Sequence, residues 1–432
     1  MGLFSPKTQK IKPAKNLTGT IQFPGDKSIS HRYAMLGAIA EGPTEIHFFS
    51  TSADCQSTLT CLKQLGVGIE RKDNVVLIQG AGLSGLRPAA QPLNAGNSGS
   101  TMRMLAGILA GQPFRSVVVG DASLSRRPMM RVAAPLELMG ARIKLGEGGL
   151  PPLEIEGGVL KPIRYEMPVA SAQVKSAILL AGLFAEGETE VVEKVQTRDH
   201  TEIILEQMGA SIGCYHRTIA VRGRARLTGR KLHVPGDLSS AAFFIGAGLI
   251  APDSNLVLHN VGLNPTRTGI LDVLAPMGAR VKVVNVEMLN GELIGNLHIE
   301  SGPLRGGEIP ESAVPGIIDE LPILAVLGTQ TEEGLTFRGA AELRVKESDR
   351  LAAVAENLRR MGAEVEEFPD GLRVAGRQTL HGAEIDPHDD HRIAMAFAVA
   401  GLVAHGGTEI KNSSCVDISF PDFFEILSRV AD

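Results

Sequence analysis

A pattern of polar and apolar positions recurs about every 70 residues along the chain, six times. In each copy a few polar residues open a very apolar stretch with helical spacing, and a turn and a short Thr/Val/Ile-rich strand follow. Repetition at a fixed period is typical of stacked or duplicated supersecondary units. Because a helix N-terminus binds anions, six such units can aim six anion sites at one place. The copies begin at Ser28, Ser98, Ser171, Ser239, Asp319 and Asp390.

A second motif repeats out of phase with the first and ends an amphipathic helix with a glycine. It reads LKQLGVGIE, LELMGARIK, LEQMGASIG, LAPMGARVK and LRRMGAEVE. A glycine just past a helix end favours the left-handed conformation that terminates the helix. Each unit is therefore predicted as strand–helix–strand–helix–strand–strand, and the sixth ends in the helical FFEILSRVAD. The glycines expected to have positive φ are Gly66, Gly140, Gly209, Gly278 and Gly362.

The first helix of each unit is apolar all round, so we expect it to be central and surrounded by sheets. PGDKSIS at Pro24 and PGDLSSA at Pro235 start the first and fourth copies, which leaves three units in each half. The strand-like GTIQF before the first unit is expected to complete a sheet of the C-terminal half. The sequence therefore predicts an α/β (α+β) protein with a continuous domain, 24–235, and a discontinuous one, 1–23 plus 236–432. The central helices of each domain are expected to point the same way, so that two such domains could face each other.

Length and composition agree with two globular domains and exclude some partners. The chain has 432 residues, of which 44% are hydrophobic and 21% charged, and its net charge of −5 implies no general attraction to nucleic acid. The longest apolar stretches, near 241–251 and 393–404, are shorter than the roughly 20 residues that cross a bilayer. The N-terminal segment has no apolar signal core. Four scattered cysteines without a CxxC pair indicate reduced thiols and a cytoplasmic protein.

Cations gather at the polar openings although the chain as a whole is acidic. One such charge would be read as an ordinary surface residue, but recurrence across several openings predicts an anion cleft. Two carboxylates, Asp319 and Glu347, stand among these cations; the alternative for Asp319 is a simple helix N-cap. The cations, with Gln173 beside them, are Lys27, Arg32, Arg103, Lys175 and Arg392 at the openings, and Arg127, Arg198, Lys346 and Arg350 in loops.

Two other motifs are not assigned a function. GAGLSG at Gly80 matches GxGxxG, but it runs into LRPAAQP, where no helix can start soon, so a dinucleotide site is not predicted. PHDDHR at His388 looks like a metal cluster, yet no second segment supplies ligands. Asp389 and Asp390 are instead expected to cap a helix beside Arg392, and no metal is predicted.

Together the motifs resemble the enolpyruvyl transferases, and among them the branch that acts on shikimate 3-phosphate. The matching segments are PGDKSISHR, NSGSTMR, RRPM, SAQVKS, RDHTE, DELP, RVKESDR, DDHRIAMA and FPDFFEIL, in collinear order over nearly the whole chain. Members of the family have two domains of three βαβαββ units, which agrees with the repeats. This branch belongs to the shikimate pathway of chorismate and aromatic amino acid biosynthesis and is the target of glyphosate.

The resemblance also implies a reaction. The 5-hydroxyl of shikimate 3-phosphate attacks C2 of phosphoenolpyruvate and C3 is protonated. The tetrahedral intermediate then expels phosphate, with loss of a proton from C3, to leave an enolpyruvyl ether. No metal or organic cofactor takes part. Both substrates carry a phosphate and a carboxylate, so only cations and helix N-termini could hold them together. These two small molecules are the expected partners of a chain expected to be monomeric.

Matching positions imply a role for each site residue. Asp319 would take the 5-hydroxyl proton, Glu347 would protonate C3, and Lys27 would share in catalysis. The residues that would bind shikimate 3-phosphate are Lys27, Ser28, Arg32, Ser171, Ala172, Gln173, Arg198, Asp319 and Lys346. Those that would bind phosphoenolpyruvate are Lys27, Gly99, Arg127, Gln173, Arg350 and Arg392. Ile418 stands where many members have a lysine that contacts phosphoenolpyruvate, so the resemblance does not imply that contact here.

Two alternatives remain at this point. The sister branch acts on UDP-N-acetylglucosamine and carries a reactive Cys or Asp on a loop near 115–127; here FRSVVVGDASLSRRP has no Cys, and Asp121 lies outside that context. The other alternative is a non-catalytic anion-binding relative that kept the fold. The presence of both Asp319 and Glu347 argues against it.

Overall fold

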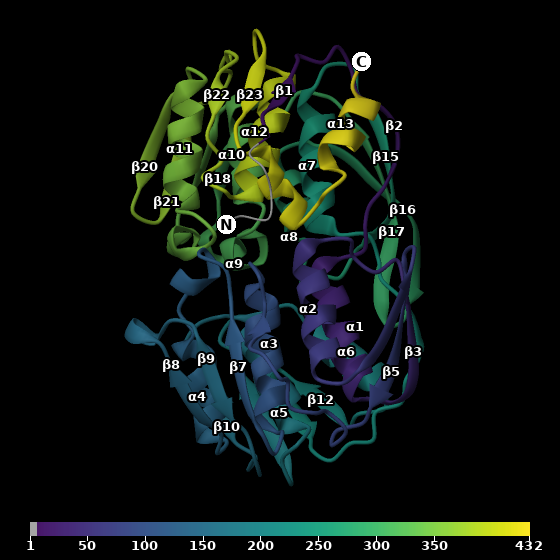
Figure 1. Ribbon diagram of the computed structural model, residues 1–432. Helices are drawn as coiled ribbons and strands as arrows, with labels where there is room; N and C mark the ends of the chain where they lie inside the picture. Colours follow the sequence, from purple (N-terminus) through teal and green to yellow (C-terminus); the bar gives the residue numbers. More distant parts are fainter. Residues whose placement is uncertain (1–6) are drawn as a thin grey trace. The chain divides into compact units, whose positions relative to one another are not determined.

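A computed structural model describes residues 7–432 of the chain (Figure 1). These residues fall into two compact units, each with its own hydrophobic core. Residues 1–6, which begin both the expected discontinuous domain and the N-terminal segment without a signal core, lie outside the described residues. Unit 1 comprises the described residues up to Pro24, together with Pro235–Glu287 and Leu293–Asp432. Unit 2 comprises Gly25–Val234 and the short segment Met288–Glu292. No sequence pattern indicated that short segment. Apart from it, the units divide at Pro24/Gly25 and at Val234/Pro235, and the expected domain was 24–235.

Unit 2 contains three repeats, each with two helices and a four-stranded sheet. The first sheet has the order β14 (Lys231–His233), β3 (Glu41–His47), β5 (Val75–Ala81), β4 (Gly68–Lys72). The second has the order β6 (Leu93–Asn94), β7 (Arg115–Val119), β9 (Leu153–Glu156), β8 (Arg142–Leu145). The third has the order β10 (Arg164–Glu166), β11 (Glu188–Val192), β13 (Thr218–Arg222), β12 (Ile212–Tyr215). The helices are α1 (Lys27–Ile39), α2 (Ala53–Gln64), α3 (Gly99–Ala110), α4 (Met130–Leu138), α5 (Ala172–Gly182) and α6 (His200–Gln207).

Unit 1 repeats this plan with two four-stranded sheets and one three-stranded sheet. The first has the order β16 (Arg280–Leu289), β17 (Glu292–Glu300), β15 (Asn255–Gly262), β2 (Thr18–Gln22). The second has the order β18 (Gly307–Ile309), β19 (Leu335–Phe337), β21 (Gly371–Val374), β20 (Val365–Phe368). The third has the order β1 (Gln9–Ile11), β23 (Thr408–Ile410), β22 (Glu384–Ile385). The helices are α7 (Leu238–Ile250), α8 (Gly269–Leu274), α9 (Val314–Ile317), α10 (Leu321–Gln330), α11 (Arg350–Arg360), α12 (His391–Leu402) and α13 (Phe423–Val430).

Strand pairing follows one rule in the repeats. The strand before the central helix pairs in parallel with the strand after it. The last strand of the repeat then pairs antiparallel with that second strand. The expectation for GTIQF is confirmed, because β2 pairs in parallel with β15 in unit 1. The strand before α7, β14, pairs in parallel with β3 and so completes the sheet of the first repeat within unit 2. The strands that precede α1 and α7 therefore each pair with the strand that follows the other helix.

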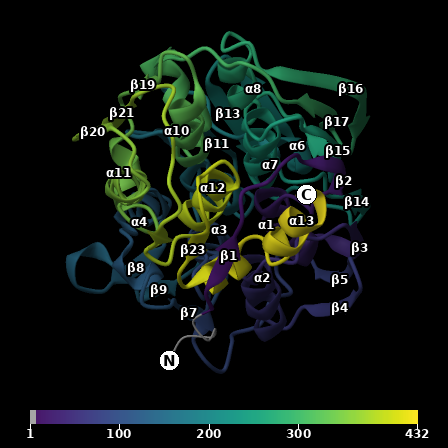
Figure 2. The same ribbon diagram turned by 90° about the horizontal axis from the view of Figure 1, so that it is seen from above.

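The central helices are buried on all sides, as their uniform apolar sequence predicts. Every residue of α7 from Leu238 to Leu249 is buried, and α7, α10 and α12 pack on one another near the centre of Figure 2. In unit 2, α3 and α5 approach so closely that a Cβ on Gly107 would lie 2.1 Å from the Ala177 carbonyl oxygen. Within residues 7–432, no helix combines the length and the apolar character needed to cross a membrane.

The glycines that end the second helices have the predicted conformation. Their φ angles are +87° at Gly66, +111° at Gly140, +94° at Gly209, +79° at Gly278 and +83° at Gly362. Residues with a Cβ rarely adopt this region, so glycine is the favoured residue where the chain leaves the helix toward the next strand.

Candidate functional site

In unit 2, side-chain hydrogen bonds bring the N-termini of α1, α3 and α5 together. Arg103 Nη1 on α3 donates to Gln173 Oε1 on α5 at 2.8 Å, and Gln173 Nε2 donates back to Ser100 Oγ at 2.9 Å. Arg32 Nη2 on α1 donates to Ser176 Oγ on α5 at 2.9 Å. Three helix N-termini that meet in this way create a region of positive potential, as the repeat pattern predicted.

A polar side chain caps each of these three helices. Asp26 Oδ1 accepts from Ile29 N at 2.9 Å, Ser98 Oγ from Thr101 N at 3.0 Å, and Ser171 Oγ from Val174 N at 3.4 Å. The expected substrate contacts at Ser171 and Ala172 therefore stand at the cap and the first residue of α5. Short side chains at these positions allow an anion to approach the first-turn N–H groups.

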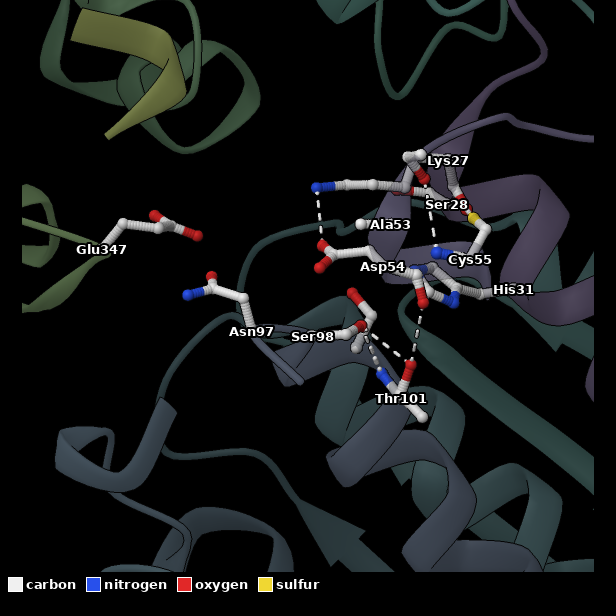
Figure 3. Close-up of polar contacts among 12 residues, drawn as sticks. Lys27, Ser28, His31, Ala53, Asp54, Cys55, Asn97, Ser98, Thr101 and Glu347 are labelled. Atoms are coloured by element: carbon white, nitrogen blue, oxygen red, sulfur yellow. Dashed lines mark hydrogen bonds and ion pairs between the residues drawn. The ribbon is translucent and has the colours of Figure 1, made fainter. Parts of the chain in front are cut away.

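Lys27, the first residue of α1, is paired with a carboxylate that sequence reasoning missed. Its Nζ lies 3.0 Å from Asp54 Oδ2, an ion pair that is visible in Figure 3. Asp54 stands in the first turn of α2, where an acidic residue is ordinary. No sequence signal distinguishes it from other first-turn carboxylates. The side chain of Lys27 is 19% exposed, so its ammonium can still meet a ligand.

Arg127 and Gly99 lie side by side at the opening of α3. Arg127 Nη2 donates to Asn97 Oδ1 at 2.8 Å and to Ser123 Oγ at 3.1 Å. A Cβ built on Gly99 would lie 2.7 Å from Arg103 Nη1 and 3.5 Å from Arg127 Nη1. The α-carbon of Gly99 is thus flanked by two guanidinium groups, and the missing side chain leaves room for them. Asn97 belongs to the NSGSTMR motif, but the sequence pattern did not identify it as a site residue.

Arg32 is buried, with only 4% of its surface exposed, and it joins three elements. Its Nε donates to Thr201 Oγ1 on α6 at 2.7 Å, and its Nη1 donates to the Ser28 carbonyl at 2.8 Å. With the bond to Ser176 described above, the guanidinium links α1, α5 and α6. Arg198 is half-buried, and its Nη1 lies 3.5 Å from Ser28 Oγ.

One cation is not where the sequence placed it. Lys175 was expected among the cations at the opening of α5, but it is 1% exposed and turned into unit 2. Its Nζ lies 2.6 Å from Glu202 Oε1 and 3.2 Å from Glu193 Oε2. The prediction was wrong because helical spacing does not show which side chain turns inward; two buried carboxylates hold this ammonium inside.

A buried polar chain runs beneath the openings of α1, α2 and α3. His31 Nδ1 lies 2.7 Å from Thr58 Oγ1, which lies 2.7 Å from Thr101 Oγ1. Thr101 Oγ1 donates in turn to Ser98 Oγ at 2.8 Å (Figure 3). Burial, followed by the charges of Lys27 and Arg32, lowers the pKa of His31 well below its ordinary value. The imidazole is therefore neutral and acts as a hydrogen-bonding link between helices.

In unit 1, the buried Arg350 gathers the carboxylates. Its Nε lies 2.7 Å from Asp390 Oδ2, its Nη2 2.5 Å from Glu347 Oε2, and its Nη1 3.4 Å from Asp319 Oδ1. Burial alone would lower the pKa of Arg350, but the charges of Asp390, Glu347 and Asp319 raise it above its ordinary value. The sequence had named three of these four residues for the site; Asp390 was expected only as a helix cap.

Asp319 lies among three cations. Its carboxylate oxygens are 3.4 Å from Arg350 Nη1, 3.6 Å from Lys346 Nζ and 4.0 Å from Arg392 Nη2. Arg392 Nη1 also donates to the Asp319 carbonyl at 2.8 Å. The simple N-cap alternative is wrong, because Glu320 holds the cap position of α10 and makes no side-chain cap bond. Asp319 is thus directed toward the cations rather than toward its own helix.

The openings of α7, α10 and α12 meet in unit 1 as those of α1, α3 and α5 meet in unit 2. Ser239 Oγ on α7 donates to Glu320 Oε1 at 2.5 Å, and Arg392 on α12 contacts Asp319 just before α10. Asp390 Oδ1 caps α12 by accepting from Arg392 N at 2.9 Å, as expected. Asp389, for which the same role was expected, is exposed and stands before the cap residue. In the part of the chain that the structure describes, no group of three or more His, Cys, Asp or Glu side chains could hold a metal ion.

The predicted site residues therefore divide into two clusters, one in each unit. The unit 2 cluster contains Lys27, Ser28, Arg32, Gly99, Arg127, Ser171, Ala172, Gln173 and Arg198. The unit 1 cluster contains Asp319, Lys346, Glu347, Arg350 and Arg392. The first is rich in cations and helix N-termini that suit anions, and the second holds two carboxylates on a common guanidinium.

Known proteins are similar to this chain in sequence and in fold. Residues 11–427 match the family model of EPSP synthase (3-phosphoshikimate 1-carboxyvinyltransferase). A 3-phosphoshikimate 1-carboxyvinyltransferase from Solibacter usitatus is 54% identical over 424 residues, covering 98% of this chain and 100% of the relative. An EPSP synthase structure from Acinetobacter baumannii superposes with a TM-score of 0.89 and 45% identity, covering 99% of this chain and 98% of that one.

A more distant structure shows how far the fold extends. The enolpyruvyl transferase NikO from Streptomyces tendae has a TM-score of 0.79 at 20% identity, with 99% of this chain and 98% of that chain covered. At this identity the likeness concerns the fold alone. The two-unit architecture with central helices is therefore shared well beyond close sequence similarity.

Proposed function

This chain belongs to the EPSP synthase family, the 3-phosphoshikimate 1-carboxyvinyltransferases, and we propose how its residues divide the reaction among themselves. The enzyme transfers the enolpyruvyl group of phosphoenolpyruvate to the 5-hydroxyl of shikimate 3-phosphate and releases phosphate, a step of the shikimate pathway. The two substrates together bring roughly five negative charges. Holding them close requires cations and helix dipoles in a defined arrangement.

The unit 2 cluster would hold the phosphates and the shikimate ring. Arg198, Ser171, Ala172 and Gln173 would bind the phosphate of shikimate 3-phosphate, with the N-terminus of α5 supplying backbone N–H groups. Ser28 would bind the same substrate. Arg32 would bind shikimate 3-phosphate as well. Its bonds to Ser28, Ser176 and Thr201 support this role, because they hold its guanidinium beside α5 and α6.

The opening of α3 would receive phosphoenolpyruvate. Gly99 removes the side chain that would otherwise stand between the guanidinium groups of Arg103 and Arg127. An Arg fork matches carboxylate and phosphate oxygens. Lys27 and Gln173 would contact both substrates, since Lys27 opens α1 and Gln173 bonds to α3 residues from α5.

The unit 1 cluster would supply the acid and the base. Asp319 would accept the 5-hydroxyl proton, and Glu347 would protonate C3 of phosphoenolpyruvate. Lys346 would contact shikimate 3-phosphate, and Arg350 and Arg392 would bind phosphoenolpyruvate. The observation that carries this proposal is that Asp319 and Glu347 both contact the guanidinium of Arg350, at 3.4 and 2.5 Å. A phosphate or carboxylate that binds this arginine would compete with the carboxylates and free them for proton transfer.

An activity assay tests the proposal directly. The purified protein is mixed with shikimate 3-phosphate and phosphoenolpyruvate, and phosphate release and the enolpyruvyl product are measured. We expect one phosphate per enolpyruvyl ether formed, and no phosphate release when either substrate is left out. Turnover with UDP-N-acetylglucosamine in place of shikimate 3-phosphate would point to the sister activity, and substrate binding without turnover would point to a non-catalytic relative.

We also propose that the enzyme works as a cytoplasmic monomer. Four free cysteines, of which Cys55, Cys61 and Cys415 are buried, support a reducing compartment. Sedimentation at working concentrations tests the oligomeric state, and a stable dimer would contradict it.

A further inference from the structure

A buried ion cluster stands behind the proposed phosphate site of unit 2. The ammonium of Lys175 contacts Glu202 Oε1 at 2.6 Å and Glu193 Oε2 at 3.2 Å. The three side chains are only 1%, 6% and 3% exposed, respectively. The reaction described above uses none of them.

The cluster fixes the peptide that carries Arg198. Lys175 Nζ donates to the Thr197 carbonyl at 3.3 Å, and that carbonyl belongs to the peptide group joining Thr197 to Arg198. On the other side, Glu193 Oε1 accepts from Thr197 N at 3.1 Å and also from the Thr197 hydroxyl. Both backbone polar groups of Thr197 are thus held from inside the unit.

The segment held in this way has no regular structure of its own. Residues 193–199 connect β11 to α6 without helix or strand. A loop of this kind would otherwise sample many conformations, each with the Arg198 side chain in a different place. The bonds to Thr197 restrict the backbone immediately before Arg198, whose Nη1 lies 3.5 Å from Ser28 Oγ.

The charges of the cluster do not balance. One ammonium faces two carboxylates, and Glu202 Oε2 is buried with no hydrogen-bond partner among residues 7–432. Burial raises the pKa of Glu202, and the charge of Lys175 opposes that rise. A buried ion group of this kind adds little stability over apolar packing. Stability alone therefore does not account for the cluster, whereas the placement of Arg198 does.

We propose that Lys175 is a positioning residue for the phosphate of shikimate 3-phosphate, and this rests on the proposed function of Arg198. Lys175 does not touch the substrate. It acts through the Thr197 carbonyl, with Glu193 and Glu202 holding its ammonium in place, so that Arg198 is preorganised for the phosphate.

Substitution of Lys175 tests this, because it should change KM for shikimate 3-phosphate but not KM for phosphoenolpyruvate or kcat. Lys175→Met removes the ammonium, and Lys175→Met/Glu202→Gln also removes one of the two carboxylates that would be left buried without a cation. We expect KM for shikimate 3-phosphate to rise about tenfold in each soluble variant, the equivalent of one lost charged hydrogen bond. KM for phosphoenolpyruvate and kcat should stay within about twofold, because unit 1 and the opening of α3 are unchanged. Lys194→Met, at an exposed position of the same loop, is the matched control and should resemble the parent.

A double-mutant cycle with Arg198→Ala identifies the route of the effect. Once Arg198 is absent, adding Lys175→Met should raise KM for shikimate 3-phosphate by less than about twofold. An unchanged KM in the soluble Lys175 variants, or a full additional increase on the Arg198→Ala background, overturns the inference. If the parent protein itself neither binds nor turns over shikimate 3-phosphate, the proposed function fails instead, and the two failures are thereby distinguished.

Discussion

The guanidinium of Arg350 and the carboxylate of Asp390 form an ion pair inside unit 1, with Nε 2.7 Å from Oδ2 and both side chains essentially inaccessible. The pair joins the start of α11 to the cap of α12, segments 40 residues apart in the sequence. Because Arg350 also contacts Glu347 and Asp319, Asp390 fixes the position from which Arg350 meets the two carboxylates.

Replacing Asp390 by Asn should therefore cost stability as well as activity. Asp390→Asn removes the fully buried countercharge of the Arg350 guanidinium, and we expect the free energy of unfolding to fall by about 3 kcal/mol. Urea unfolding measures this. Asp389→Asn, at the exposed neighbouring position, is the control and should change it by less than about 0.5 kcal/mol. A loss at Asp390 no larger than that of the control would show that the pair is not structural.

Glu347 should be needed for the chemical step more than for binding. Glu347→Gln keeps the shape of the side chain but removes the exchangeable carboxyl proton, and we expect kcat to fall about a hundredfold or more. The KM values should change far less. Steady-state kinetics with both substrates provide the measurement, with Glu366→Gln on β20, an exposed position, as the control. Near-parental kcat would remove Glu347 from the role of acid.

Gly99 should be required for space at the opening of α3. In Gly99→Ala the new methyl group would lie 2.7 Å from Arg103 Nη1, which must then move away from its bond to Gln173. We expect KM for phosphoenolpyruvate to rise about tenfold while the fold persists, because the displaced atom ends a flexible side chain. Gly213→Ala, where a Cβ meets nothing within 4 Å, is the matched control. Equal KM values in the two variants would refute the steric argument.

Gly107 should be required for the close approach of α3 to α5. Alanine is the better helix former, yet its methyl group would lie 2.1 Å from the Ala177 carbonyl oxygen, a rigid backbone atom. We expect Gly107→Ala to lower the free energy of unfolding by about 2 kcal/mol, since the helices must move apart. Chemical unfolding compared with Gly213→Ala checks this. A variant as stable as the parent would mean that the helices separate without cost.

His31 should make stability depend on pH. Its pKa in the folded chain lies well below the ordinary value of 6.5, so below about pH 6.5 the unfolded chain takes up a proton that the folded chain does not. The contribution is present above that pH and is lost as the pH falls, at up to about 1.4 kcal/mol per pH unit. We expect His31→Gln to reduce the slope by that amount when unfolding is measured between pH 6.5 and 5. His298→Gln, exposed on β17, should follow the parent, and an unaltered slope in His31→Gln would contradict the prediction.

The sequence by itself determined the repeating architecture, because the signals for it are local. Apolar stretches without a polar face predicted central helices, and five glycines predicted left-handed helix ends that the structure contains. The exchange of β2 into the sheet of the C-terminal half could also be predicted, from the position of GTIQF before the first repeat. The motifs at the helix openings were sufficient to place the chain in its family.

Only the tertiary structure decided which way the charged side chains turn. Lys175 and Gln173 are two residues apart at the same helix opening, yet the ammonium of Lys175 lies inside with Glu193 and Glu202, whereas Gln173 bonds to α3. Asp54, on α2, forms an ion pair with Lys27, on α1, and no sequence signal indicated this pair. The physical reason is that a buried charge is stable only beside opposite charge, and segments distant in the sequence supply that charge.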